Sequence, residues 1–343
     1  MRFTQEWPEN VIVTHFGSFP GVELLDVFRA MAMPTITMHA LTLAGIDMPL
    51  SRIGFGCMRL APSQELETFP RLDAYRALGG NLFDTAEVYG QGQSEKALGQ
   101  YLRKTGGREG VVIVTKGCVE PKLLRPECIL RAIEGSLERL QLDVIDVYLL
   151  HRDDPTVPVG ELVDTLNAAA DSGKIRAFGV SNWPVKRIDD ANRYASTRGI
   201  RHLTVSSPHV SLLVPREPWW PGCTHATPRD LSWYREKNLV VLGWSAQARG
   251  FLDQQPPTDT AYLAELIRVY FSQDNLEKRR RVHDLAKRLG CHPGRLAIAY
   301  VLGLDAPTIA LFGPRSVADV HEVMAARDIE LSQMDRRWLE LVD

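Results

Sequence analysis

Four side chains that can exchange protons follow β-like segments of the sequence. Asp84, Lys116 and His151 each stand at the carboxyl end of an apolar segment, and Tyr89 lies on the loop after the first of them. A carboxylate, a phenol, an amine and an imidazole are typical acid–base groups. Each alone has a commoner structural explanation, such as a cap or a packed ring. Their shared placement favours a catalytic site, because barrel enzymes hold their catalytic groups at the carboxyl ends of the strands.

Eight β-rich segments alternate with helical patterns from residue 52 onward. Strands are predicted at 53–56, 81–85, 111–116, 144–150, 175–180, 202–206, 240–244 and 308–312. Several are continuous apolar runs, as expected for parallel strands buried on both faces. Helices with apolar residues at helical spacing are predicted at 126–141, 158–172 and 293–303. Eight alternations predict a single (β/α)8 TIM barrel of the α/β class rather than an open doubly wound sheet.

Three segments are additional to the strands, helices and short loops of a (β/α)8 barrel. Residues 1–38 carry no catalytic motif, so we expect a dispensable extension there and the barrel domain at 39–343. A hairpin is predicted at 39–49, closing the end of the barrel opposite the active site. Residues 213–230, rich in Pro and Trp, and residues 251–275 follow the sixth and seventh strands. We expect both as long loops at the catalytic face, since loops of this length are often functional.

Composition places the chain among ordinary globular proteins. Its 343 residues are 45% hydrophobic and 24% charged, with a net charge of -2, which argues against nucleic-acid binding. The five cysteines form no C-x-x-C pair, which fits free thiols in a reducing compartment and argues against a metal site for zinc. No apolar run is long enough to span a membrane, and the first residues do not resemble a signal peptide. We therefore expect a cytoplasmic protein, with its oligomeric state left open.

Five motifs are shared with one enzyme family. They are Gly54-Phe55-Gly56, the block F-D-T-A-E-V-Y-G-Q-G-Q-S-E-K-A-L-G at 83–99, Lys116, L-Q-L-D-V-I-D-V-Y-L-L-H ending at His151, and G-K-I-R-A-F-G-V-S-N-W ending at Trp183. On these motifs the chain resembles the aldo-keto reductase superfamily, from residue 40 to residue 342. No G-x-G-x-x-G motif follows a predicted strand, so a Rossmann domain is not supported.

The resemblance implies a catalytic tetrad of Asp84, Tyr89, Lys116 and His151. A nicotinamide gives a hydride to a carbonyl carbon, and Tyr89 protonates the carbonyl oxygen. Lys116 is expected to lower the pKa of Tyr89, which is near 10 for a free phenol, and Asp84 to hold Lys116 in place and charged. A neutral His151 would hydrogen-bond the carbonyl oxygen and orient it. In the oxidative direction the acid and base roles reverse.

The resemblance also implies two groups of cofactor-binding residues. The nicotinamide and its carboxamide would contact side chains at the ends of strands: Ser181, Asn182, Ser207 and Trp244. The pyrophosphate and adenosine would contact the loops after the seventh and eighth strands and the helix that follows: Ser245, Arg249, Gly250, Gly313, Arg315, Ser316 and Asp319. Ser207 stands where the family usually has Gln, and its shorter side chain keeps a hydrogen-bond donor. The start of the last helix is expected to favour the anionic adenosine end.

The choice between cofactors depends on Asp319. Many relatives place Arg or Gln at this position to contact the adenosine 2′-phosphate, and a carboxylate there would repel a phosphate. Arg315 is the nearby cation that would offset this repulsion. The resemblance favours NADP(H), and Asp319 leaves NAD(H) or dual use open.

The substrate is less defined than the chemistry. Trp219 and Trp220, in the loop P-W-W-P-G-C, would form an apolar wall over the substrate or stack on a sugar ring, with loop packing as the alternative. The leading interpretation is reversible NAD(P)H-dependent reduction of a small aldehyde or ketone, a sugar or ketosugar among them, to an alcohol. Two alternatives remain: an NAD-dependent sugar dehydrogenase, and a non-catalytic cofactor-binding regulatory subunit. Retention of the whole tetrad weighs against the second.

Overall fold

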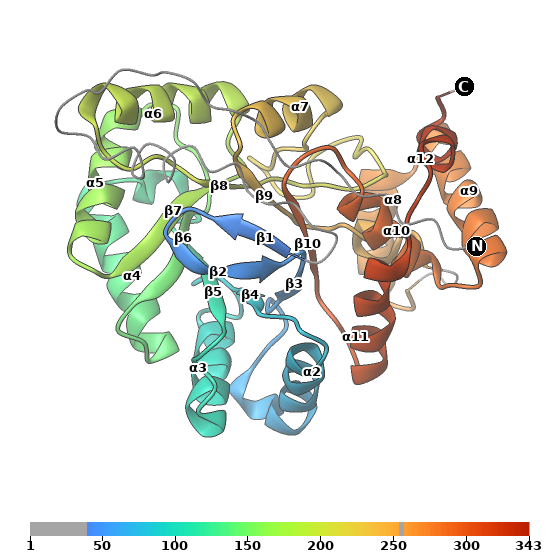
Figure 1. The fold of residues 1–343 in the computed structure, drawn as a ribbon, viewed down its shortest axis with the longest axis horizontal. Helices are drawn as coiled ribbons and strands as arrows, with labels where there is room; N and C mark the ends of the chain where they lie inside the picture. The colour runs from blue at the N-terminus through green and yellow to red at the C-terminus, as the bar shows by residue number, and fades with distance from the viewer. Residues whose placement is uncertain (1–39, 254–256, 343) are drawn as a thin grey trace, which may run out of the picture. The chain divides into compact units, whose positions relative to one another are not determined.

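A closed barrel of parallel strands forms the centre of the computed structural model, which describes residues 40–253 and 257–342 (Figure 1). The barrel strands are β3 Ile53–Gly56, β4 Leu82–Asp84, β5 Val112–Gly117, β6 Ile145–Leu150, β7 Ile175–Ser181, β8 Val205–Ser207, β9 Val240–Gly243 and β10 Thr308–Phe312. The ring closes where β10 pairs with β9 on one side and with β3 on the other. The eight predicted strands and the barrel are therefore confirmed, with small differences at the strand ends.

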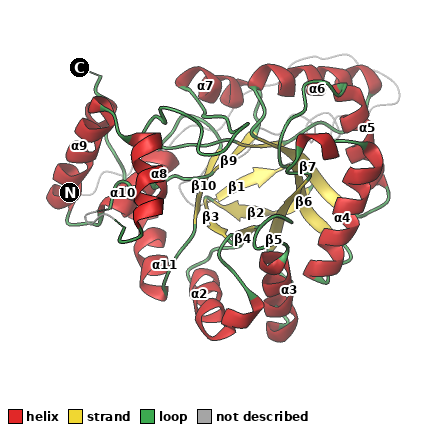
Figure 2. Ribbon diagram, turned by 180° about the vertical axis from the view of Figure 1, so that it is seen from behind, coloured by secondary structure: helices red, strands yellow, loops and turns green. Residues whose placement is uncertain are grey.

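Helices surround the strands, as Figure 2 shows in red and yellow. They are α2 Glu65–Ala77, α3 Gln93–Thr105, α4 Pro126–Leu140, α5 Val159–Asp171, α6 Val185–Arg198, α7 Pro228–Glu236, α8 Thr260–Tyr270, α9 Gln273–Leu289, α10 Pro293–Leu302, α11 Val317–Met324 and α12 Gln333–Glu340. The three predicted helices correspond to α4, α5 and α10. Of the helices described, none has the length and apolar character needed to cross a lipid bilayer. The cytoplasmic location stays a prediction.

The connection after β9 differs from the loop expected at 251–275, because it contains α8 and the start of α9. The Asp259 side chain accepts hydrogen bonds from the first backbone N–H groups of α8, and Ser272 caps α9 in the same way. Leu266, Val269 and Tyr270 are buried at helical spacing. Capping and an apolar face together stabilise a helix in this segment.

Two layers of apolar side chains pack against the barrel strands. Alternate residues point outward toward the helices, such as Phe55 and Phe83, whose rings lie 5.9 Å apart. The residues between them point inward and fill the barrel with aliphatic side chains, such as Leu82, Val112 and Leu242. Because side chains fill the interior, space for a ligand is left at the rim of the barrel.

A two-stranded antiparallel hairpin closes the amino-terminal end of the barrel. Its strands are β1 Ala40–Leu43 and β2 Ile46–Ser51, and Leu41 and Leu50 are buried against the inner aliphatic layer. The Ser51 backbone N–H donates to Asn81 Oδ1 at 2.8 Å, which ties the hairpin to the start of β4. The predicted hairpin is confirmed at the predicted end, apart from residue 39, which lies outside the described residues.

Residues 1–38 also lie outside the described residues, and their dispensability stays a prediction. We expect a chain beginning at Met38 to fold and to keep its kcat/KM, because the hairpin that closes the barrel begins at Ala40. Thermal unfolding and steady-state kinetics of the shortened and full-length chains would check this. A shortened chain that folds normally but has lost activity would contradict it.

Candidate active site

A cavity of about 760 Å³ opens at the carboxyl ends of the barrel strands. It brings together side chains from every part of the barrel, from β4 to α11. The predicted site residues on its wall are Asp84, Tyr89, Lys116, His151, Ser181, Asn182, Ser207, Trp220, Trp244, Ser245, Arg249, Gly250, Gly313, Arg315 and Asp319. Two predicted residues, Trp219 and Ser316, do not line it.

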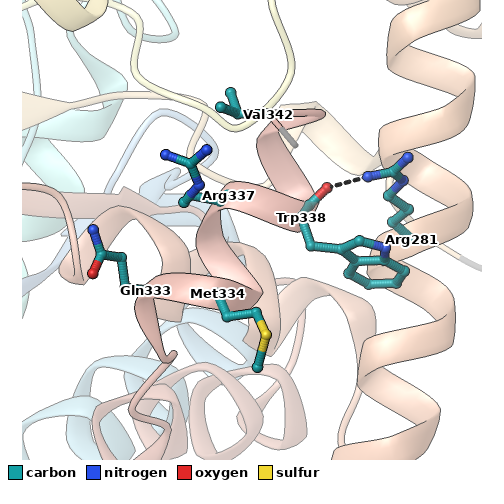
Figure 3. Close-up of a pocket in the computed structure, with 6 residues that line it drawn as sticks. All are labelled: Arg281, Gln333, Met334, Arg337, Trp338 and Val342. Atoms are coloured by element: carbon teal, nitrogen blue, oxygen red, sulfur yellow. Dashed lines mark hydrogen bonds between the residues drawn. The ribbon is translucent and has the colours of Figure 1, made fainter.

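A second hollow, of about 540 Å³, lies between α9 and α12 (Figure 3). Arg281 crosses it, donating to the Trp338 main-chain oxygen at 2.6 Å, with its guanidinium 5.3 Å from the indole ring. The lining residues are Arg281, Gln333, Met334, Arg337, Trp338 and Val342. None of them is a predicted site residue, so the cavity at the rim is the candidate active site.

Lys116 stands between Asp84 and Tyr89. Its Nζ is 2.7 Å from Asp84 Oδ1 and 3.4 Å from the Tyr89 hydroxyl, and it also donates to the Thr85 main-chain oxygen at 2.9 Å. The Lys116 and Asp84 side chains are only 3% and 5% exposed. The neighbouring strands β4 and β5 hold the pair, which places the ammonium in contact with the phenol, as the resemblance implies.

The charges in this cluster follow from burial and from the ion pair. Burial lowers the pKa of Lys116, but Asp84 and Tyr89 together outweigh it and raise that pKa above its usual value. The ammonium is therefore charged at neutral pH. Burial raises the pKa of Tyr89, and Lys116 opposes this rise. The lowering effect expected of Lys116 is therefore present, but burial is the larger effect, and the pKa of Tyr89 lies above its usual value.

His151 follows β6 and faces the phenol. The centroids of the His151 and Tyr89 rings are 6.0 Å apart in an edge-on arrangement. Burial, with Lys116 and Arg152 adding to it, lowers the pKa of His151 well below its usual value. The imidazole is therefore neutral, as expected, and carries one N–H that can donate to an oxygen atom in the cavity.

The ends of β7 and β8 place hydrogen-bonding side chains on the cavity wall. Asn182 Nδ2 donates to Ser181 Oγ at 2.8 Å and to the His151 main-chain oxygen at 3.4 Å, which holds this amide beside the tetrad. Ser207 Oγ donates its hydrogen to the Leu242 main-chain oxygen at 2.9 Å. Ser207 therefore offers lone pairs rather than the expected donor. A carboxamide carries an NH₂ group that can donate to such lone pairs, so Ser207 fits the NH₂ side of a nicotinamide carboxamide.

The opposite end of the cavity contains paired charges. Asp319 Oδ2 accepts from the Arg315 backbone N–H at 2.9 Å and lies 3.3 Å from its Nε, and Asp253 lies 3.7 Å from the same guanidinium. Arg315 thus offsets Asp319 by pairing with it directly. The Ser316 side chain accepts from the Asp319 backbone N–H and caps α11. This role explains why Ser316 lies off the cavity wall.

The comparison with known proteins decides the family. The model of the aldo/keto reductase family matches residues 52–341, most of the chain. This chain belongs to the aldo/keto reductase family. It is therefore an oxidoreductase that acts on small carbonyl compounds or the corresponding alcohols, and the resemblance found in the sequence is confirmed.

Three relatives show how far the similarity extends. Aldo-keto reductase yakc [NADP(+)] of Schizosaccharomyces pombe is 27% identical, over 82% of this chain and 84% of its own. A probable voltage-gated potassium channel subunit beta of Oryza sativa is 30% identical, over 75% and 81%. The crystal structure of an aldo-keto reductase from Klebsiella pneumoniae in complex with NADPH superposes with a TM-score of 0.71 at 25% identity, covering 89% of this chain and 95% of that one.

The two tryptophans of this aldo-keto reductase have different surroundings. Trp220 is 38% exposed and lines the cavity, whereas Trp219 is 7% exposed and packs against Tyr262 and Tyr270. The expectation that Trp219 touches substrate is therefore wrong, and loop packing is its role. The Arg249 guanidinium lies 4.3 Å from the Trp219 ring centroid and 4.9 Å from that of Trp220. Its charge faces this loop, although its backbone lies in the segment expected at the pyrophosphate.

Seven charged or titratable residues on the wall were not predicted from the sequence: Arg59, Arg152, Cys223, Asp253, Tyr262, His292 and Glu322. Arg152 directly follows His151, so its position in the sequence already indicated that it lies at the carboxyl end of β6. Asp253 lies three residues beyond Gly250, in a segment expected only as a loop. His292 comes from the start of α10, which no sequence pattern places at the rim, whereas Glu322 lies three residues after Asp319 on α11, the helix already expected there.

Proposed function

We propose that this aldo-keto reductase reduces an aldehyde or ketone to an alcohol with a nicotinamide dinucleotide, and that Tyr89 gives the proton. The observation that carries this is the position of Lys116, in contact with both Asp84 and the Tyr89 hydroxyl and almost wholly buried. A buried ammonium beside a phenol stabilises the phenolate that remains after proton transfer. A purely structural lysine would not need a phenol as its second partner.

Each residue of the tetrad has a separate role in the proposed reaction. When bound, the reduced cofactor supplies the hydride. The neutral His151 donates a hydrogen bond to the carbonyl oxygen and orients it, and Tyr89 donates its proton as negative charge builds on that oxygen. Lys116 stabilises the resulting phenolate across 3.4 Å, and Asp84 holds Lys116 in place. In the oxidative direction the Tyr89 phenolate accepts the proton of the alcohol.

We propose NADP(H) as the cofactor. The Schizosaccharomyces pombe relative is named for NADP(+), and the Klebsiella pneumoniae structure contains NADPH. Ser207 fits the NH₂ group of the carboxamide, and Asn182 and the half-buried Trp244 ring line the cavity as well. The segment from Ser245 to Gly250 turns sharply, with φ of 61° and 93° at its two ends, and lines the wall beside them. We place the pyrophosphate against this segment and the adenosine near Gly313 and Arg315.

Asp319 is expected to oppose a cofactor that carries a 2′-phosphate. Its carboxylate already uses the Arg315 backbone N–H and guanidinium, the groups a phosphate would need. Asp319→Arg should raise the ratio of kcat/KM for NADPH to that for NADH by about ten-fold, equivalent to ~1.4 kcal/mol. Arg315→Ala should lower the same ratio. The ratio is the right measurement, because a general loss of folding lowers both values alike.

Glu330→Arg is the matched control for this change. Glu330 is exposed, lies off the cavity wall and undergoes the same change of charge. In Glu330→Arg, the ratio of kcat/KM for NADPH to that for NADH should equal that of the unmodified protein. An unchanged ratio in both Asp319→Arg and Arg315→Ala would show that neither residue lines the adenosine site.

Oxidation of NADPH and NADH in the presence of carbonyl compounds tests the proposed function directly. The panel should contain 4-nitrobenzaldehyde as a broad substrate, together with aldoses and ketoses, and the reverse reaction should be run with sugars and NAD(+). Turnover of a carbonyl compound supports reduction, and turnover of sugars with NAD(+) alone supports the dehydrogenase alternative. Cofactor binding without any turnover would favour the regulatory subunit, an alternative to which the name of the Oryza sativa relative lends weight.

A further inference from the structure

Arg152 is a buried guanidinium at the active site with unused hydrogen-bond donors. It is 9% exposed, lines the cavity, and donates from Nη1 to the His151 main-chain oxygen at 2.9 Å. The adjacent carboxylate, Asp153, pairs with Arg187 instead. Within the described residues, Nε and Nη2 of Arg152 have no hydrogen-bond partner and no carboxylate pairs with it. A buried charge in this state is costly unless a ligand compensates it.

Positive charge is in excess at this end of the cavity. The Lys116 ammonium is compensated by Asp84, whereas neither Arg152 nor Arg249 forms an ion pair in the part of the chain described. Burial raises the pKa of the Cys223 thiol, and both guanidinium groups oppose that rise. Both therefore lie near the same cysteine, which is itself on the cavity wall. An anionic group placed here would meet two cations and no competing carboxylate.

We propose that the substrate carries an anionic oxygen group, a carboxylate or a phosphate, and that Arg152 binds it. The inference rests on the proposed carbonyl reduction and names its substrate class. Nε and Nη2 form one edge of the guanidinium, and such an edge binds two oxygens of a carboxylate or phosphate through parallel N–H bonds. Since Arg152 follows His151 directly, the carbonyl oxygen and the anion belong to one small molecule.

The loop after β8 limits the size of this molecule. Gly222 has a φ of +73°, and a Cβ there would lie 3.5 Å from Arg152 Cδ, so the loop packs on the arginine stem. Trp220, two residues earlier, presents its partly exposed indole to the same space. A flat apolar spacer between carbonyl and anion suits this wall, since aromatic faces pack well on an indole.

Carboxybenzaldehydes test the proposal because they separate an aldehyde and an anion by a rigid ring. The 2-, 3- and 4-carboxy isomers should be compared with their methyl esters, with 4-nitrobenzaldehyde as the neutral reference. Comparison of glyceraldehyde 3-phosphate with glyceraldehyde tests in the same way whether a phosphate is preferred. We expect at least one acid to exceed its ester in kcat/KM by about 30-fold, mainly through KM, because hydrogen bonds to charged groups are the stronger class.

Substitution of Arg152 should remove this preference. Arg152→Gln is expected to bring the acid-to-ester ratio close to one, and Arg152→Lys to keep part of it. Arg193→Gln is the matched control, because Arg193 lies exposed on α6 and loses the same charge. Calorimetric titration with benzoate and with inorganic phosphate gives a second measurement that needs no turnover. Both ions should bind more weakly to Arg152→Gln than to Arg193→Gln.

The outcomes separate this proposal from the one on which it rests. Reduction of 4-nitrobenzaldehyde with acid-to-ester ratios near one in every pair would overturn the anion site and leave carbonyl reduction standing. Failure to reduce any aldehyde would overturn the proposed function, and equal benzoate and phosphate binding in the two variants would then overturn the anion site as well. A preference that survives Arg152→Gln but is lost in Arg249→Gln would show that Arg249 holds the anion, and the assignment to Arg152 would be wrong.

Discussion

Replacing Tyr89 with phenylalanine should lower kcat for carbonyl reduction by about 10²–10⁴-fold, the range typical for loss of a general acid. The substitution removes one oxygen atom and leaves the ring, which faces His151 edge-on. The cofactor should still bind within a few-fold of its original affinity, since we place the nicotinamide against the ends of β7 and β8 and the loop after β9, away from the Tyr89 hydroxyl. Steady-state kinetics with 4-nitrobenzaldehyde and a fluorescence titration with NADPH would measure the two quantities separately.

Tyr194→Phe is the control for this change. Tyr194 lies on α6, and its hydroxyl donates to Asp164 at 2.7 Å, away from the cavity. Its loss should leave kcat as it was. Near-normal turnover in Tyr89→Phe would remove the phenol from the mechanism, and with it the role assigned to Lys116.

Lys116→Met should lower kcat in both directions and shift the pH profile of alcohol oxidation upward. Burial raises the pKa of Tyr89, and the ammonium is the largest effect that opposes this rise, so its removal should raise that pKa further. The phenolate that accepts the alcohol proton then forms only at higher pH. A shift of about one unit or more is expected for the loss of an opposite charge at this range. In the reducing direction kcat falls because the phenolate product loses its stabilising partner.

The pH profile of alcohol oxidation measures this shift. Lys116→Met also leaves Asp84 buried without its cation, which costs stability, so thermal unfolding must be followed alongside activity. Lys116→Arg keeps the charge and should return the profile toward that of the unmodified protein. Substantial activity with an unchanged profile in Lys116→Met would refute the electrostatic role.

The fold and the tetrad were predictable because the same physical constraint determines both. A parallel strand buried on both faces favours a near-continuous apolar run, and the sequence shows such runs at β5 and, apart from Asp146, at β6. The carboxyl ends of all barrel strands meet at one rim, so a polar residue at the end of such a run has a defined position. Lys116 and His151 could therefore be placed before their neighbours in space were known.

The loops were not predictable in the same way, because side-chain direction there depends on contacts between distant segments. Trp219 and Trp220 are adjacent and identical in type, yet Tyr262, from α8, buries the first and leaves the second at the cavity. Ser316 was expected at the adenosine end of the cofactor, but its hydroxyl accepts from the Asp319 backbone N–H, and the Asp319 carboxylate pairs with Arg315. The direction in which the pKa of Tyr89 shifts could not be predicted either, because a sequence motif does not show how deeply a side chain is buried.

Within residues 40–253 and 257–342, the hairpin of β1 and β2 covers the amino-terminal end of the barrel with apolar side chains. We therefore expect ligands to enter and leave through the rim at the opposite end. Ser207 is fully buried at the base of the cavity, whereas Trp220 is partly exposed at its mouth. A ligand that reaches Ser207 is therefore covered by one that rests on Trp220. If the cofactor occupies the site at Ser207 as proposed, we expect it to arrive before the substrate and to leave after the product.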